Sequence, residues 1–461
     1  MGILKHIKSR LSSGSNDPSL GAGIYHFRRQ NGEEKSRLHL RIDPDGNAIL
    51  MVNANRVYHL NPSAGFMTFQ YLEGVNITEA CANLARRYSI AKKDALYDIT
   101  QFYRQMDELV RPDGACPICD LELDTVAPFS SRPAAPYRMD LAITYRCNNA
   151  CTHCYNPKSR HKNELETKQW LQVIDQLWQI GIPHIVFTGG EPTLRPDLPQ
   201  LIERAQANGQ ITGLNTNGRR LMDAAYLQTL VDAGLDHVQI TLESHDADIH
   251  DQMVAHRGAW HQTVGGIRNA LQSPLFVMTN TTMLQTNVNG MAETLDFLAT
   301  LGVPTVGLNA LIYSGNGLTV GSGLPEAQLP DLLDLARRKT DQAAQRLIWY
   351  TPTQYCHFDP VQLELGVKGC TAALYNMCVE PDGEVLPCQS YYQSLGNITQ
   401  KPWQQIWEHE LAVSLRERKG LDEACYTCAA IQECGGGCPL AKDACQTYQP
   451  SALSALESPP W

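Results

Sequence analysis

Apolar and polar residues alternate from Arg37 onward, in the pattern typical of short strands. Three such runs occupy residues 38–42, 48–52 and 57–60, and Asn61-Pro62 then marks a helix start. Helical patterns follow, and the last places five apolar residues on one face, namely Leu96, Ile99, Phe102, Met106 and Val110. The pattern predicts a winged-helix-like unit of three strands and three helices over residues 22–112, after a disordered segment, residues 1–21.

A second pattern follows a proline-rich linker, residues 113–136. Helical runs end at glycine and pass quickly into apolar strands, with six strands near residues 141, 184, 211, 238, 277 and 306. The helix from Thr167 places four large residues on one face, namely Trp170, Val173, Ile174 and Leu177. Strands separated by helices form right-handed βαβ units. We therefore expect residues 137–355 to form an α/β domain, a partial (β/α)6 barrel with its ligands at the carboxyl ends of the strands.

Composition narrows the functional class. The chain has 461 residues and a net charge of −10, which disfavours a nucleic-acid partner. It shows no signal peptide and no apolar stretch long enough for a membrane span. Most of its 15 cysteines are clustered, as in metal sites of cytoplasmic proteins. We expect a cytoplasmic protein without a membrane partner.

The first cysteine cluster is Cys147, Cys151 and Cys154, which directly follows the first strand of the second pattern. Three thiolates ligate three irons of a four-iron cube and leave the fourth iron open to a ligand that is not protein. A zinc site is the alternative, with His153 as a fourth ligand. Such a zinc site would be strained, because His153 lies directly between Cys151 and Cys154 in the sequence.

The C-x3-C-x2-C spacing and the following Tyr155 resemble the radical S-adenosylmethionine (SAM) superfamily. The resemblance implies a [4Fe-4S] cluster on the triad with SAM on its open iron. One electron then splits the sulfonium, and the resulting 5′-deoxyadenosyl radical removes hydrogen from a C–H bond. Later segments resemble the SAM-binding strand ends of that superfamily, among them GGEP and TNG elements. They imply SAM contacts from Tyr155, Gly189, Gly190, Glu191, Pro192, Asn215, Asn217 and Thr241. Ordinary turn chemistry is the alternative, above all for Thr241.

The C-terminal cysteines follow the spacing of the SPASM region, which we assign to residues 356–446, followed by a tail, residues 447–461. That resemblance implies two further [4Fe-4S] clusters, three in all. Auxiliary cluster I would be held by Cys370, Cys378, Cys388 and Cys438. Auxiliary cluster II would be held by Cys425, Cys428, Cys434 and Cys445. Four thiolates leave no open iron, so these clusters would transfer electrons or support structure. Two zinc sites on the same ligands are the alternative.

Residues 57–74 resemble PqqD-like proteins, the leader-binding modules called RiPP recognition elements, in which a leader peptide adds a strand to the small sheet. A DNA-binding wing is the alternative, although the basic residues of the last helix are offset by acidic ones. Together the three modules resemble maturases of ribosomally made precursor peptides. They imply thioether or carbon–carbon crosslinking, or excision of a tyrosine-derived unit as in spliceases. An external electron donor is implied, and an accessory protein is a further candidate partner.

Several features depart from these families or stay unassigned. Gln389 follows Cys388, where sulfatase-maturing relatives carry Asp, which argues against formylglycine formation. Tyr355 and Cys356 are candidate catalytic donors of a proton or hydrogen atom, although a buried, inert cysteine is the alternative. Cys116 and Cys119 form a lone C-x2-C pair without an assigned role. A small-molecule enzyme related to the haem-pathway SPASM proteins is a second candidate, and it would not need the leader-binding module.

Overall fold

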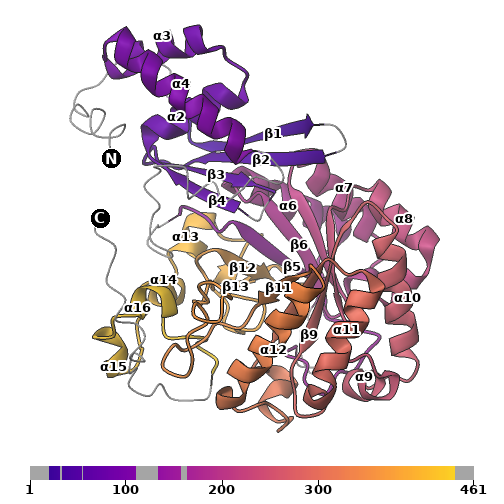
Figure 1. The fold of residues 1–461 in the computed structure, drawn as a ribbon. Helices are drawn as coiled ribbons and strands as arrows, with labels where there is room; N and C mark the ends of the chain where they lie inside the picture. Colours follow the sequence, from indigo (N-terminus) through magenta and orange to yellow (C-terminus); the bar gives the residue numbers. More distant parts are fainter. Residues whose placement is uncertain (1–19, 32–33, 54–55, 111–132, 157–162, 442–461) are drawn as a thin grey trace. The chain divides into compact units, whose positions relative to one another are not determined.

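The computed structural model describes residues 20–31, 34–53, 56–110, 133–156 and 163–441 (Figure 1). They form two compact units: the first contains residues up to Ala135 with Gln176–Pro183, and the second contains the rest. The predicted disordered N-terminus, Cys116, Cys119, Cys445 and the C-terminal tail lie outside the described residues.

The first unit has four antiparallel strands where the sequence predicted three. They are β1 (Gly23–Asn31), β2 (Glu34–Ile42), β3 (Ala48–Val52) and β4 (Arg56–Leu60), paired in that order. The prediction omitted β1, whose nine residues pair with β2 from Gly23↔Ile42 to Asn31↔Glu34. The sequence does carry its signal, because Asn31-Gly32 is a strong hairpin dipeptide.

Three helices follow, namely α2 (Pro62–Leu72), α3 (Ile77–Tyr88) and α4 (Lys92–Leu109). The predicted cap is confirmed, since the Ala64 amide donates to Asn61 Oδ1 at 2.9 Å. Of the predicted apolar stripe of α4, Leu96 is wrong, because it is 48% exposed. Ala95 faces the core in place of Leu96 and is fully buried, as is the predicted Ile99 one helical turn later.

The second unit is built on a ten-stranded sheet. All six predicted barrel strands are present, parallel and neighbours in chain order. They are β5 (Arg138–Thr144), β6 (His184–Gly189), β7 (Ile211–Thr216), β8 (His237–Thr241), β9 (Phe276–Thr282) and β10 (Thr305–Asn309). A seventh parallel strand, β11 (Arg346–Trp349), extends this series beyond β10. On the other side, β12 (Asn376–Val379) pairs in parallel with β5, and β13 (Glu384–Leu386) and β14 (Gly396–Asn397) follow antiparallel.

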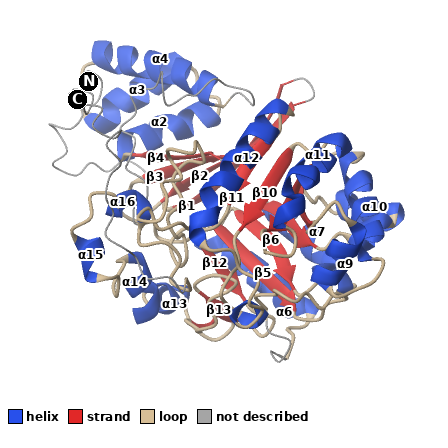
Figure 2. Cartoon of the chain, turned by 60° about the horizontal axis from the view of Figure 1, so that its bottom comes forward, coloured by secondary structure: helices blue, strands red, loops and turns tan. Residues whose placement is uncertain are grey.

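Helices connect the parallel strands and surround them on their outer side (Figures 1 and 2). They are α6 (Thr167–Ile180), α7 (Leu198–Asn208), α8 (Ala224–Asp232), α9 (Ala247–Val254), α10 (Ala259–Leu271), α11 (Met291–Leu301) and α12 (Leu329–Gln342). The predicted stripe of α6 is confirmed, with Trp170, Val173, Ile174 and Leu177 all buried. Four short helices belong to the C-terminal region, namely α13 (Trp403–Trp407), α14 (Glu410–Arg416), α15 (Glu423–Tyr426) and α16 (Ile431–Cys434). None of the helices in the described ranges is long and apolar enough to cross a bilayer.

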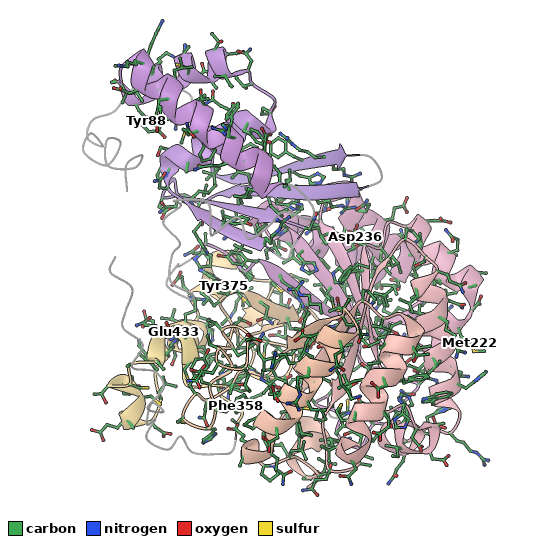
Figure 3. The ribbon with its side chains drawn as sticks, in the orientation of Figure 1. Tyr88, Met222, Asp236, Phe358, Tyr375 and Glu433 are labelled. Atoms are coloured by element: carbon green, nitrogen blue, oxygen red, sulfur yellow. The ribbon has the colours of Figure 1, made fainter. Side chains whose placement is uncertain are left out.

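The two faces of the barrel strands differ in polarity. On β5, Met139, Leu141 and Ile143 are fully buried on one face, and the alternate residues Arg138 and Asp140 lie on the other. Strand register continues the row of Asp140 through Val186 and Gly213 to His237. Figure 3 shows Asp236, which precedes β8, and Met222 among the side chains of this unit.

Interactions of Arg138 show that the sheet curls into a partial barrel. Arg138 interacts electrostatically with His237 on β8 and with Tyr350, which directly follows β11. Strand β11 stands six strands from β5, a path of about 29 Å in a flat sheet. One side chain can approach both positions only if the face that carries Asp140 and His237 is the inner, concave face.

Candidate metal centres

The three N-terminal cysteines lie on one loop directly after β5. Two amides of this loop, those of Ala150 and Thr152, donate to the carbonyls of Val254 and Met253 at the end of α9, both at 2.9 Å. Asn316, in the short helix η4 (Gly315–Leu318), donates to the carbonyls of Cys154 and Cys151 at 2.8 and 3.0 Å. Neighbouring elements therefore fix the backbone on which the three thiols stand.

The three thiols are close enough to interact with one another. Burial, together with the Glu191 carboxylate and the Cys154 thiol, raises the pKa of Cys147 to about 11. Burial and both neighbouring thiols raise the pKa of Cys151 well above its ordinary value. Grouped thiols whose thiolates are disfavoured need a cation to hold them deprotonated, as iron does. The donor set therefore fits an iron–sulfur cluster.

His153 is bound to a carboxylate instead of facing the thiols. Its Nε2 lies 3.0 Å from Oε1 of Glu243, and both side chains are buried. Burial lowers the pKa of His153, but Glu243 outweighs it and raises the pKa overall. This pairing weighs against His153 as the fourth ligand of a zinc site.

Gly189 and Gly190 pack directly on the segment that precedes Cys147. The amides of Gly190 and Glu191 donate to the carbonyls of Thr144 and Arg146 at 2.7 and 2.8 Å. A Cβ on Gly190 would lie 2.3 Å from the Arg146 carbonyl oxygen, and one on Gly189 would lie 2.1 Å from that of Thr144. Glycine is thus required here for close backbone approach.

Glu191 is fully buried, and both carboxylate oxygens accept hydrogen bonds from the protein. Oε1 accepts from the amide and hydroxyl of Thr193 and from the hydroxyl of Thr216, and Oε2 accepts from the amide of Asn217 at 2.8 Å. Burial raises the pKa of Glu191, although these bonds oppose the rise. In the structure Glu191 joins the ends of β6 and β7, and its contact with SAM stays a prediction.

The other expected SAM contacts surround the same strand ends. Tyr155 donates to Oε1 of Gln389 at 3.2 Å, and burial raises the pKa of its phenol far above the ordinary value. Asn217 donates to Oδ1 of Asn148 at 2.6 Å, within the cysteine loop. Register places Asn215 and Thr241 on the inner face, since Asn215 pairs with Gln239 two residues before Thr241. Pro192 is buried at the start of the short helix η1 (Pro192–Leu194).

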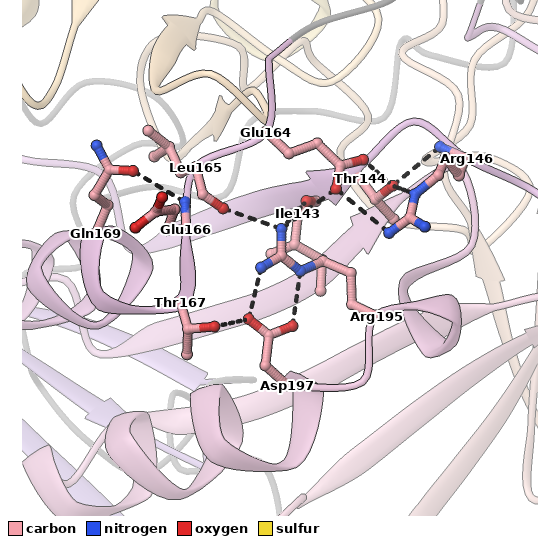
Figure 4. A network of polar contacts seen from close by, with 10 residues as sticks. All are labelled: Ile143, Thr144, Arg146, Glu164, Leu165, Glu166, Thr167, Gln169, Arg195 and Asp197. Carbon is pink, nitrogen blue, oxygen red and sulfur yellow. Dashed lines mark hydrogen bonds and ion pairs between the residues drawn. The ribbon is translucent and has the colours of Figure 1, made fainter.

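Two arginines that the sequence analysis missed support the loop. Arg219 donates through Nη1 to the Asn148 carbonyl at 2.6 Å and to Oδ1 of Asn149 at 2.7 Å. Arg195 binds Asp197 with both ends of its guanidinium and donates to the carbonyls of Ile143 and Leu165, both at 3.2 Å (Figure 4). Arg195 thereby ties the end of β5 to the start of α7. In the sequence, these arginines are marked only by their positions: Arg195 follows the GGEP element, and Arg219 follows the TNG element.

The described cysteines of the first auxiliary set lie together. Burial and the thiols of Cys438 and Cys388 raise the pKa of Cys370, and burial with Cys438 raises that of Cys388. Cys378, on β12, also interacts with Cys388. In the second set, Cys425 interacts with Cys434 and Cys428. The assignment of these thiols to two [4Fe-4S] clusters stays a prediction.

Tyr355 belongs to the auxiliary region. Its amide donates to Sγ of Cys434 at 3.4 Å, and its buried hydroxyl accepts from the amide of Lys368 at 3.2 Å. Cys356 is half-buried in the same turn. Tyr355 thus lies beside Cys434 of the second auxiliary set, Cys356 is disulfide-bonded, and the catalytic role of both residues stays a prediction.

Comparisons with known proteins agree with this geometry. Residues 141–298 match the family model of the radical SAM superfamily, and residues 370–429 match that of the SPASM iron-sulfur cluster-binding domain. The chain contains a radical SAM domain followed by a SPASM domain. These domains imply [4Fe-4S] clusters and SAM, and they make the protein a radical SAM enzyme.

Curated relatives of this radical SAM enzyme have different activities. Fe-coproporphyrin III synthase of Methanosarcina barkeri is 28% identical over 324 residues, which cover 64% of this chain and 81% of that protein. PqqA peptide cyclase of Granulibacter bethesdensis is 26% identical over 307 residues, covering 64% and 80%.

Solved structures show the same fold. SuiB of Streptococcus suis bound to the precursor peptide SuiA aligns with a TM-score of 0.67 and 14% identity, over 92% of this chain and 99% of that one. Native anSMEcpe with bound AdoMet aligns with a TM-score of 0.55 and 16% identity, over 68% and 93%. The fold of this chain therefore occurs in known structures.

Proposed function

We propose that this enzyme is a maturase that modifies a ribosomally synthesised precursor peptide through a 5′-deoxyadenosyl radical. The reaction is excision of a tyrosine-derived unit from the backbone, or thioether or carbon–carbon crosslinking. The observation that carries the proposal is a four-stranded unit with an open edge on the same chain as the radical SAM and SPASM domains. The similarity to peptide-bound SuiB over 92% of the chain supports it.

Strand β4 is the proposed docking edge for the leader peptide, in the manner of PqqD-like domains. Within the described strands it pairs with β3 alone and is thus an edge strand of this sheet, the kind of strand to which peptides add in β-augmentation. Val57 on this strand is 36% exposed, and Leu96 and Tyr97 of α4 are 48% and 59% exposed. An extended leader with apolar side chains fits such an edge.

In this proposal the Cys147, Cys151 and Cys154 triad holds the SAM cluster, and the two auxiliary sets hold one [4Fe-4S] cluster each. When bound, the SAM cluster supplies the electron that cleaves SAM. The residues of this chain fix the cysteine loop through hydrogen bonds from Asn316, Asn217 and Arg219. An external electron donor is required, an accessory protein is a further partner, and the cytoplasm is the compartment that keeps these thiols reduced.

A small-molecule reaction of the haem-pathway kind is the second candidate, favoured by the similarity to Fe-coproporphyrin III synthase. Co-expression with short open reading frames near the gene, followed by mass spectrometry of the peptides, separates the two. Loss of a residue-sized mass assigns excision, and loss of two hydrogens assigns crosslinking. Unchanged peptides together with turnover of an iron porphyrin would assign the second candidate.

The docking edge is tested with full-length protein and labelled precursor peptide in fluorescence anisotropy. Val57→Asp is expected to weaken binding about tenfold or more, because it places a charge on the edge that receives the apolar peptide. Arg28→Ala on β1, the opposite edge of the sheet, serves as control. Equal losses in both variants would assign the leader to another surface.

A further inference from the structure

Asp140 is a buried carboxylate on the inner face of the barrel that no motif explains. It is 1% exposed and stands in the middle of β5, seven residues before Cys147. Nε of Arg138 donates to its Oδ1 at 2.7 Å. This bond uses one of the roughly four lone-pair sites of an ionised carboxylate. Buried carboxylates are rare unless paired, so the position has a specific cause.

Asp140 lies between the two kinds of cysteine site. Strand register sets it opposite Cys378 of the first auxiliary set. It also interacts electrostatically with Tyr155, which directly follows Cys154 of the SAM-cluster triad. Tyr155 in turn donates to Gln389, next to Cys388. A substrate held between SAM and the first auxiliary cluster would therefore pass this carboxylate.

We propose that Asp140, held by Arg138, orients the substrate by accepting a hydrogen bond from the core peptide on the inner face of the barrel. The donor is a backbone N–H or a side-chain O–H of the residue to be modified. The bond fixes which C–H group faces SAM. This inference rests on the proposed peptide substrate.

The test compares Asp140→Asn with wild type, using the precursor that wild type modifies. A hydrogen bond to a charged group accounts for roughly tenfold to a hundredfold in binding. The leaderless core peptide should bind Asp140→Asn about tenfold more weakly in anisotropy without SAM or reductant. In turnover, product per 5′-deoxyadenosine should fall at least tenfold, while iron content and cleavage of SAM stay within twofold. Asp140→Glu, which keeps the carboxylate, should recover part of the product formed per 5′-deoxyadenosine.

Two further variants keep the result interpretable. Asp140→Asn leaves the Arg138 guanidinium without its partner, so the double variant R138Q/D140N restores a neutral pair and should show the same uncoupling. Asp175→Asn is the control, because Asp175 also binds an arginine, Arg204, at 2.6 Å, but between α6 and α7. A precursor with Phe in place of Tyr lacks the side-chain O–H, and a precursor with an N-methylated amide lacks the backbone N–H. The precursor that loses affinity for wild type identifies the donor.

The outcomes separate the two hypotheses. No modified peptide with wild type contradicts the proposed function. This inference alone is overturned if wild type modifies the peptide and Asp140→Asn shows the same product per 5′-deoxyadenosine and the same affinity for the core peptide. Loss of iron or of SAM cleavage in proportion to product in both Asp140 variants also overturns it, because Asp140 would then serve the fold.

Discussion

At the scale of single residues, Glu191 illustrates how a motif residue can act through its neighbours. Its carboxylate accepts four hydrogen bonds that join two strand ends, and one of the donors, Asn217, also contacts the cysteine loop. The residue that sequence similarity assigns to SAM binding thus joins two strand ends and, through Asn217, the cysteine loop.

Glu191→Gln should destabilise this junction. The new amide nitrogen would face protein donors, which leaves at least one buried donor unpaired at a cost of about 1–3 kcal/mol. We expect denaturant unfolding to show this loss and the spectroscopic response of the cluster to added SAM to weaken. Glu203→Gln, on the exposed side of α7, is the control and should leave both unchanged. An unaltered SAM response in Glu191→Gln would contradict the positioning role.

His237 should make stability depend on pH. Burial, followed by the charge of Arg138, lowers its pKa to about 4, and its Nε2 lies 2.8 Å from that of His184. Because the unfolded residue binds its proton near pH 6.5, the stability that neutral His237 contributes is complete above that pH and is lost as pH falls toward 4. Between pH 7 and pH 5, the free energy of unfolding of wild type should fall by about 2 kcal/mol more than that of His237→Gln. Urea unfolding of both proteins at the two pH values measures this difference. A constant difference would show that His237 titrates normally.

At the scale of elements, the loop after β6 determines where the cysteine loop lies. Gly190→Ala introduces a methyl 2.3 Å from a carbonyl oxygen of the segment before Cys147, so that segment must move. We expect the variant to fold but to lose the triad cluster, about four irons per chain, in iron analysis. Gly258→Ala is the control for backbone strain without a clash, because Gly258 has a positive φ, +81°, which Gly190 lacks, and no atom lies within 4 Å of its added Cβ. Full iron content in Gly190→Ala would show that the loop tolerates the shift.

Sequence patterns predicted helices and strands well where the hydrophobic periodicity was strong. The six barrel strands and the α6 stripe followed from apolar runs and glycine stops, and the triad followed from its spacing. Strand β1 was missed because its arginines and histidine mask the alternation, although Asn31-Gly32 marked the hairpin. Arg219 and the His153–Glu243 pair could not be predicted, because their partners are distant in sequence and meet only in the folded chain.

At the scale of the whole molecule, the SPASM region shares the hydrogen-bonded sheet of the barrel. Asn376–Val379 of β12 pairs with Arg138–Leu141 of β5, four residues before the cysteine loop is reached. The thiol of Cys378 therefore stands on a strand that the barrel itself supports. The first auxiliary cluster should in turn stabilise this end of the sheet.

Removing that cluster should loosen the sheet locally. The double variant Cys378→Ala and Cys388→Ala is expected to lose about four irons per chain and to raise amide hydrogen exchange in β12 and β13 about tenfold. Exchange in β7 to β9 should stay the same. Cys81→Ala, in the first unit, is the control for removal of a buried cysteine thiol. Uniformly faster exchange would mean that the unit unfolds as a whole.

The parallel pairing of β12 with β5 also constrains how such enzymes can exchange parts. A chimera that grafts a foreign C-terminal region onto this barrel must keep the alignment of Asn376 with Arg138 and of Cys378 with Asp140. A shift of one residue would turn the cysteine to the opposite face of the strand. Recombination between homologues is thus expected to tolerate crossovers in the loops after β11 and to reject those that change the length between Thr371 and Cys378.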